Sequence, residues 1–144
     1  MQNEMIFLVP CDSDARAPRD LRGKTVGLQA YTAEQEALEA ADFYENIYVV
    51  YGSDYVELME RMQRGELDAV FTDSVFAYYY IFNGGEPVYV LSDSLGEDGY
   101  AVGFRKHDQA LRDRVQETLN EMSADGTLSA LSQKWFGSDI TLVQ

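Results

Sequence analysis

The sequence has very few of the residues that build disulfides, metal sites and acid–base catalytic centres. Its 144 residues contain one cysteine, Cys11, and one histidine, His107. A single cysteine excludes an internal disulfide and a cysteine-rich metal site. His107 lies in a polar turn, no serine or cysteine has a matched base, and no glycine-rich phosphate loop is present. We therefore expect no catalytic residues, no metal site and no cofactor.

Basic residues and long hydrophobic runs are also scarce. The chain has 11 basic residues against 25 acidic ones, which gives a formal net charge of -14. Such a surface repels nucleic acid and anionic membranes, so we expect neither as a partner. The longest apolar-rich stretch, residues 74–82, is far too short to span a bilayer, and we expect no membrane insertion.

Short strand-like blocks alternate with helical ones along the chain. Helices are expected at residues 32–41, 55–63 and 74–82, followed by two C-terminal helices after residue 106. Strand character is found at residues 5–9, 25–28, 47–51, 68–72, 88–91 and 100–105. This order predicts a single α/β domain over residues 1–144, a three-layer sandwich with a mostly parallel, five-stranded sheet. Residues 5–105 would form the sheet part, and residues 106–144 the C-terminal helices.

Ligands of parallel sheets collect beyond the carboxyl ends of the strands. Here that rule selects residues 29–32, 52–54 and 72–73. Thr32 starts a helix, where free N–H groups and the helix dipole favour an anion. Asp73 follows a strand and could pair with an ammonium group. Both residues also suit a simple capping role, Thr32 within a capping box that ends at Gln35, and the pattern alone favours capping.

Four stretches carry a family resemblance. They are DLRGKTVGLQ at residues 20–29, GELDAVFTD at 65–73, YAVGFRK at 100–106, and ADGT at 124–127 followed by KWFG at 134–137. In this order and spacing, over nearly the whole chain, the sequence resembles the solute-binding proteins of polar amino-acid ABC importers, the bacterial extracellular solute-binding protein family 3.

The resemblance implies a two-lobed clamp that closes on one amino acid. This chain corresponds to the second lobe plus the C-terminal helices, with residues 5–9 as the first hinge strand and 100–105 as the return crossing. The main part of the N-terminal lobe has no counterpart in it. The implied function is amino-acid binding for an ABC-type importer, or a truncated descendant of it. The implied partners are the importer's membrane subunits, and the implied location is extracytoplasmic, although the sequence shows no export-signal pattern.

The resemblance also assigns ligand-binding roles to residues of this chain. Asp73 matches the aspartate that pairs with the ligand's α-ammonium. Thr32 and Ala33 match the small hydroxyl residues that hold its α-carboxylate, and Gln29 ends the strand that leads into this loop. The sequence departs from the family at Tyr31, where glycine is usual, and at Ala33, which offers only an N–H.

Two alternatives remain open. The first is a non-transport interaction module, in which a partner or a second copy in a homodimer replaces the missing lobe. It is motivated by an apolar stripe that must bury against something, formed by Leu111, Val115, Leu119 and Met122. The second is an enzyme on the same fold, which the absence of an acid–base set disfavours.

Overall fold

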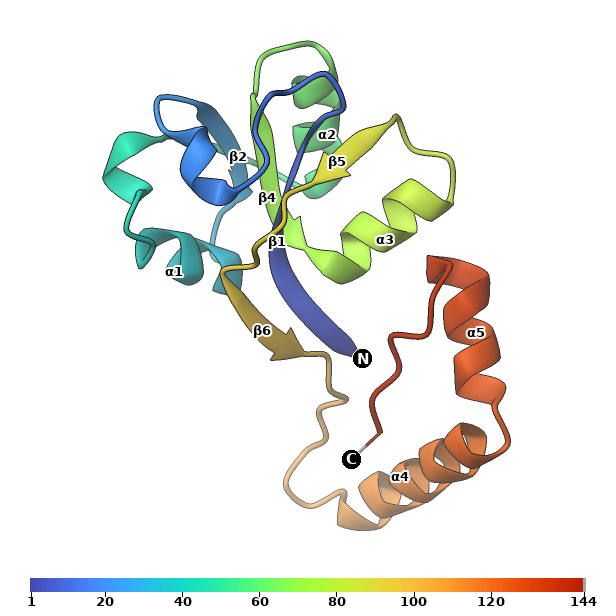
Figure 1. Ribbon diagram of the computed structural model, residues 1–144. Helices are drawn as coiled ribbons and strands as arrows, with labels where there is room; N and C mark the ends of the chain where they lie inside the picture. Colours follow the sequence, from blue (N-terminus) through green and yellow to red (C-terminus); the bar gives the residue numbers. More distant parts are fainter. Residues whose placement is uncertain (144) are drawn as a thin grey trace.

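The computed structural model describes residues 1–143, which fold around one mixed sheet with the strand order β3-β2-β4-β1-β5, while β6 also pairs with β1 (Figure 1). The six strands are β1 (Gln2–Pro10), β2 (Thr25–Gln29), β3 (Tyr48–Gly52), β4 (Ala69–Asp73), β5 (Val88–Val90) and β6 (Gly96–Gly99).

Strands β2, β3 and β4 are parallel neighbours, whereas β1 runs antiparallel to β4, β5 and β6. Between β1 and β2 the chain forms only a loop and a short 3-10 helix, Pro18–Leu21. No crossover helix follows β1, so its connection does not require a parallel arrangement. The predicted three-layer α/β fold is confirmed, as a mixed sheet with six strands rather than five.

Helices cover both faces of the sheet. Helix α1 (Ala33–Glu39) packs on one face, while α2 (Tyr55–Gln63) and α3 (Ser74–Phe82) pack on the other. The central strand β1 contributes alternate side chains to the two cores, Phe7 to the first and Leu8 to the second. Burial on both faces explains the continuous apolar run of β1 at residues 5–9.

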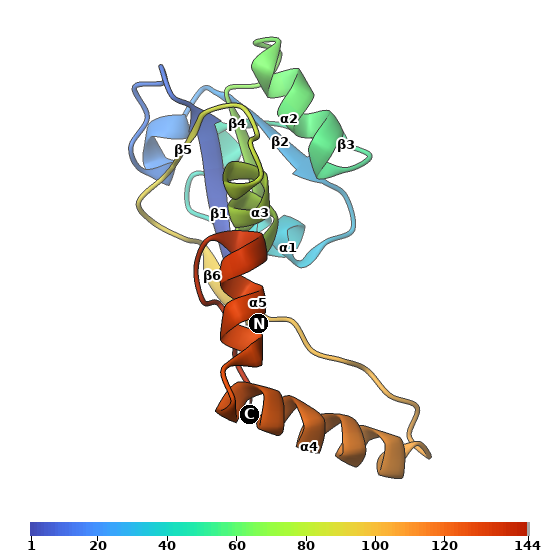
Figure 2. The same ribbon diagram turned by 90° about the vertical axis from the view of Figure 1, so that its right-hand side faces the viewer.

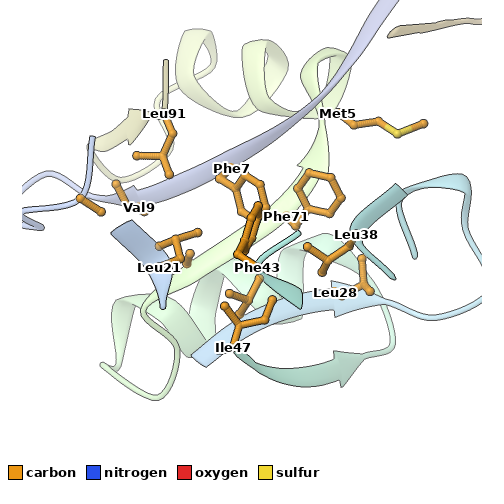
Figure 3. Close-up of a cluster of buried hydrophobic side chains, with 13 residues drawn as sticks. Met5, Phe7, Val9, Leu21, Leu28, Leu38, Phe43, Ile47, Phe71 and Leu91 are labelled. Carbon is orange, nitrogen blue, oxygen red and sulfur yellow. The ribbon is translucent and has the colours of Figure 1, made fainter. Parts of the chain in front are cut away.

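The first core contains a cluster of aromatic and aliphatic side chains (Figure 3). The rings of Phe7 and Phe71 stack with their centroids 4.3 Å apart, and Phe43 lies 6.1 Å from Phe7. Leu38 of α1 completes the contact with the sheet. These contacts fix α1 over the sheet, and so they also place the loop that precedes this helix.

The C-terminal helices α4 (Gln109–Ala124) and α5 (Thr127–Phe136) differ in their contact with the rest of the chain. Helix α5 packs against α3, and the side chain of Asn83 donates to the carbonyl oxygen of Trp135 at 3.0 Å. Helix α4 projects away from the sheet (Figures 1 and 2), and none of its residues is buried. No helix within residues 1–143 is both long and apolar enough to cross a membrane.

The prediction of a strand at residues 100–105 is wrong. The strand lies just before it, at Gly96–Gly99, where it pairs with β1 in the register Gln2↔Gly99 to Met5↔Gly96. After Gly99 the chain leaves the sheet without regular structure, and Val102 is 64% exposed. The acidic and glycine-rich sequence of β6 has little intrinsic preference for a strand, so the pairing with β1 determines its position.

Candidate functional site

The carboxyl ends of β2, β3 and β4 meet at one edge of the sheet. Gln29 pairs with Gly52, and its side-chain amide donates to the carbonyl oxygen of Ser53 at 3.3 Å. Gly27 pairs with Val70, three residues before Asp73. The three segments that the sequence selects are therefore neighbours in space.

Asp73 is the last residue of β4 and the N-cap of α3. Its Oδ1 accepts a hydrogen bond from the backbone N–H of Phe76 at 2.8 Å, and the residue is only 5% exposed. This confirms the capping interpretation of Asp73. The cap engages one carboxylate oxygen through a backbone donor, so the other oxygen can meet a second partner, and the ligand role stays a prediction.

Tyr31 has an unusual backbone conformation at the start of the α1 loop. Its φ is 64°, and it is the one non-glycine residue with positive φ among residues 1–143. A left-handed backbone is strained for a residue with a Cβ and is cheapest for glycine. The loop therefore has a shape suited to the glycine usual in the family, although tyrosine stands there. The Tyr31 side chain is fully exposed.

The prediction of a capping box between Thr32 and Gln35 is wrong. The Thr32 hydroxyl turns back and donates to the carbonyl oxygen of Gln29 at 3.0 Å, and it caps no N–H of its own helix. The Gln35 side chain instead accepts from the backbone N–H of Tyr31 at 2.9 Å. Ala33 is exposed and contributes no side-chain donor. Two donors of the proposed carboxylate loop are thus engaged within the loop itself.

Glu34 is a site residue that the sequence reasoning missed. It is 8% exposed, and none of the hydrogen bonds among residues 1–143 involves its carboxylate. It lies four residues before the core residue Leu38, so both point to the same side of α1. A charged residue at that spacing from a core leucine was the signal that could have identified it.

Two tyrosine hydroxyls lie close to Glu34 and Asp73. Partial burial raises the pKa of Tyr100 to about 12, and the negative charges of Asp73 and Glu34 add to the shift. Burial likewise raises the pKa of Tyr55 far above its ordinary value, with contributions from Glu34 and then Asp73. Because the same two carboxylates act on both hydroxyls, we call Glu34, Tyr55, Asp73 and Tyr100 the acidic cluster.

Thr72 adds one unsatisfied polar group beside this cluster. Its Oγ1 is completely buried and is the one buried side-chain polar atom without a hydrogen-bond partner in the described part of the chain. The Tyr55 hydroxyl lies next to it, without the geometry of a good hydrogen bond. The site therefore presents carboxylate and hydroxyl oxygens, a set of groups that suits a cation.

Within residues 1–143, no group of three or more histidine, cysteine, aspartate or glutamate side chains could hold a metal ion. A cavity of about 960 Å³ lies elsewhere, between the segment after β6, helix α4 and the C-terminal tail. The apolar stripe of α4 borders it through Val115 and Leu119, while Leu111 is 56% exposed. Tyr100 lines this cavity and also belongs to the acidic cluster, so it connects the two regions.

These features are typical of a ligand-binding α/β domain, because polar groups gather at the carboxyl ends of its parallel strands. Residues 5–138 match the family of bacterial extracellular solute-binding proteins, family 3, and the chain belongs to this family. The family consists of binding proteins, which confirms the expectation that this chain is not an enzyme.

The relatives of this chain include amino-acid-binding proteins. It is 31% identical to the L-cystine-binding protein TcyJ of Escherichia coli (strain K12) over 126 residues. This matched region covers 85% of this chain and 45% of TcyJ. The arginine-, lysine-, histidine-binding protein ArtJ of Geobacillus stearothermophilus has a similar structure, with a TM-score of 0.78 and 28% identity over 99% of this chain and 62% of ArtJ.

The L-arginine-bound protein Tv2483 has the same fold, with a TM-score of 0.82 at 23% identity over 99% of this chain and 59% of that one. This chain spans about half the length of the curated relatives that it matches.

Proposed function

We propose that this chain binds a polar amino acid for an ABC-type importer and forms the second-lobe half of the ligand clamp. The observation that supports this best is the position of Asp73, nearly buried at the carboxyl end of β4 with only one oxygen used by its cap. The second oxygen is suited to the α-ammonium of an amino acid. Gln29, Tyr31, Thr32 and Ala33 border the place where the α-carboxylate would rest, next to the start of α1.

The half-site alone should bind weakly. An ion pair open to water contributes only about 0–1 kcal/mol, because water screens it. High affinity then requires a second surface that closes over the ligand, such as the part of the relatives that this chain does not match. In this proposal the protein works outside the cytoplasmic membrane and delivers its ligand to the importer's membrane subunits.

Titration of the protein with a panel of amino acids, followed by NMR, tests the proposal. Chemical-shift changes should centre on residues 31–33 and on Asp73. Asp73→Asn keeps an oxygen that can cap α3 but removes the charge, so it should abolish these changes while the fold persists. An absence of shifts with every amino acid at millimolar concentration would contradict the proposed function.

A second candidate function is supported by the apolar surface beside α4. We infer that this surface packs against a second copy of the chain, because Leu111 is 56% exposed and its neighbours Val115 and Leu119 on α4 line a cavity of about 960 Å³. Light scattering over a concentration series should then show a dimer that Leu111→Glu dissociates. Gln133→Glu, which adds the same charge at an exposed position of α5, is the control. A strict monomer at high concentration contradicts this candidate.

A further inference from the structure

Strand β3 forms a free edge of the sheet. It stands at the end of the strand order β3-β2-β4-β1-β5 (Figure 2), and β2 is its one pairing partner within residues 1–143. An unpaired edge offers backbone N–H and C=O groups to another strand, so proteins often protect it with a charge, a proline or a bulge. The sequence of β3, YVVYG, contains neither charge nor proline, and its register with β2 runs without a bulge from Tyr48 to Gly52.

The ladder with β2 shows which backbone groups of β3 are free. The N–H of Tyr48 donates to the carbonyl oxygen of Lys24 at 2.9 Å, so Tyr48 turns its backbone groups towards β2. Along a strand, successive residues turn these groups to opposite sides. The N–H and C=O groups of Val49 and Tyr51 therefore point away from β2, where the described sheet has no further strand.

The next outward-facing positions on either side, residues 47 and 53, are engaged within the chain. The N–H of Ile47 donates to the carbonyl oxygen of Tyr44 at 3.2 Å. The N–H of Ser53 donates to the carboxylate of Glu57 at 2.8 Å, and its carbonyl oxygen accepts from the side chain of Gln29. An incoming strand can therefore pair only with the two outward-facing residues of β3 itself.

A tyrosine stands on each face of this edge. Val49 packs against the core under α1, whereas Val50 packs against the core under α2 and α3. Side chains alternate along a strand, so Tyr48 shares the face of Val50. Tyr51 lies on the opposite face with Val49. Tyr48 is 68% exposed and Tyr51 is 47% exposed, so aromatic surface flanks the free edge on both faces.

We propose that β3 pairs in antiparallel orientation with β3 of a second copy of this chain and joins the two sheets into one. Opposed residues that turn their backbone groups towards each other exchange both N–H···O bonds. The free groups therefore place Val49 opposite Tyr51 of the second copy and Tyr51 opposite its Val49. Val50 then lies on the two-fold axis. Each hydrogen-bonded pair also brings a β-branched side chain against an aromatic ring, which is a favourable cross-strand contact.

Charges at the two ends of β3 favour the antiparallel orientation. Arg22 is exposed beside the start of the strand, where it lines a hollow together with Glu45, Asn46 and Tyr48. Asp54 is exposed just beyond the other end of the strand. The proposed register continues to Asp54 opposite Asn46 of the second copy, next to its Arg22, so opposite charges meet twice. Parallel pairing would instead bring Asp54 beside Asp54 and Arg22 beside Arg22.

Amide hydrogen exchange of the 144-residue protein, followed by NMR, tests the pairing. The formal net charge of -14 on each copy opposes association, and salt at about 0.15 M screens this repulsion beyond about 8 Å. We expect the amides of Val49 and Tyr51 to exchange about threefold more slowly at about 1 mM protein than at about 20 µM. The amides of Tyr48 and Val50 face β2 in either state and should be protected at both concentrations.

Two variants at one position isolate the role of the free edge. Tyr51→Pro removes an outward N–H without touching the ladder with β2, so the exchange of the Val49 amide should no longer depend on concentration. Tyr51→Phe keeps the N–H and the ring, and should behave as the wild type. Leu111→Glu, on the separate surface beside α4, should also leave the dependence unchanged. The wild-type measurement tests the pairing even if Tyr51→Pro fails to fold.

Two charge variants test the orientation. Arg22→Glu places a negative charge next to Asp54 of the second copy, so about threefold more protein should be needed for the same protection of the Val49 amide. Lys134→Glu makes the same change of charge at an exposed position of α5 and should have no such effect.

The outcomes of these measurements decide the proposal. Equal exchange of the Val49 and Tyr51 amides at both concentrations overturns it and leaves the edge open to a strand of another protein. A concentration dependence that survives Tyr51→Pro also overturns it, and one that disappears in Leu111→Glu assigns the contact to the surface beside α4 instead.

Discussion

The side-chain carbonyl of Asn3 accepts two hydrogen bonds from Ser74, one from its backbone N–H at 3.1 Å and one from its hydroxyl at 3.2 Å. The Ser74 hydroxyl in turn accepts from the N–H of Glu4 at 3.0 Å. Asn3 and Ser74 are 5% and 2% exposed, so water cannot replace these contacts. They fix the start of α3, and with it Asp73, to the central strand β1.

Asn3→Ala should destabilise the protein by about 1–3 kcal/mol, because it leaves the N–H of Ser74 buried without a partner. Urea unfolding followed by circular dichroism measures this change. Asn46→Ala, at an exposed position, is the control and should change the free energy of unfolding by less than about 0.5 kcal/mol. Equal stability of the two variants would show that the Asn3 contacts are weak.

Tyr31→Gly should stabilise the protein by about 0.5–1 kcal/mol. The substitution removes the cost of a left-handed backbone, partly offset by the greater freedom of glycine in the unfolded chain. The Tyr31 side chain is fully exposed, so no burial is lost. Tyr31→Ala retains the strained backbone and should unfold at the same urea concentration as the wild type. Stabilisation by alanine would instead assign the effect to the side chain.

Asp73 and Asp54 cap neighbouring helices in the same way. Asp54 accepts from the N–H of Glu57 at 2.9 Å, and Asp73 accepts from that of Phe76 at 2.8 Å. Alanine at either position should cost about 1–2 kcal/mol of stability. Only Asp73→Ala should also abolish ligand-induced NMR shifts. Loss of those shifts in Asp54→Ala would mean that helix capping, rather than charge, controls binding.

The stability of the protein should fall between pH 10 and pH 12. The pKa of Tyr100 rises from 10.0 to about 12 in the folded state, mainly through burial. A raised folded-state pKa favours folding fully below pH 10, and this contribution disappears as the pH rises through 12. Tyr100→Phe should show a shallower decline in urea midpoint over this range. Tyr48→Phe, at a 68% exposed position, is the control; an equal effect of both variants would contradict the role of Tyr100.

The sequence predicts α2 and α3 with the bounds that the structure shows, because local groups determine their ends. Asp54 and Asp73 supply the N-caps, while Gly65 and Gly84 adopt the positive φ that follows a helix end. Long-range contacts determine what the sequence reasoning missed. Strand β6 exists because β1 offers it a partner, and no local pattern in Gly96–Gly99 predicts that pairing.

The candidate site was predictable in part for the same reason. The carboxyl-end rule and the family resemblance both select Asp73, since a strand end and a helix cap coincide there. Tyr100 reaches Asp73 from a segment distant in sequence, so only the fold brings them together. The hydroxyl of Thr32 could cap its own helix or donate to a carbonyl oxygen. The shape of the folded loop determines that it donates to the carbonyl oxygen of Gln29.

The central position of β1 has a consequence for the timing of folding. β1 precedes β2 and β3 in the chain, yet its own neighbours in the sheet, β4, β5 and β6, all follow much later. At about 5–20 residues per second, roughly 3–13 s pass between the synthesis of Pro10 and that of Asp73, the last residue of β4. During this interval β1, whose side chains are buried on both faces of the folded sheet, has no strand to pair with. A nascent chain therefore needs the apolar side chains of β1 shielded until β4 has been made.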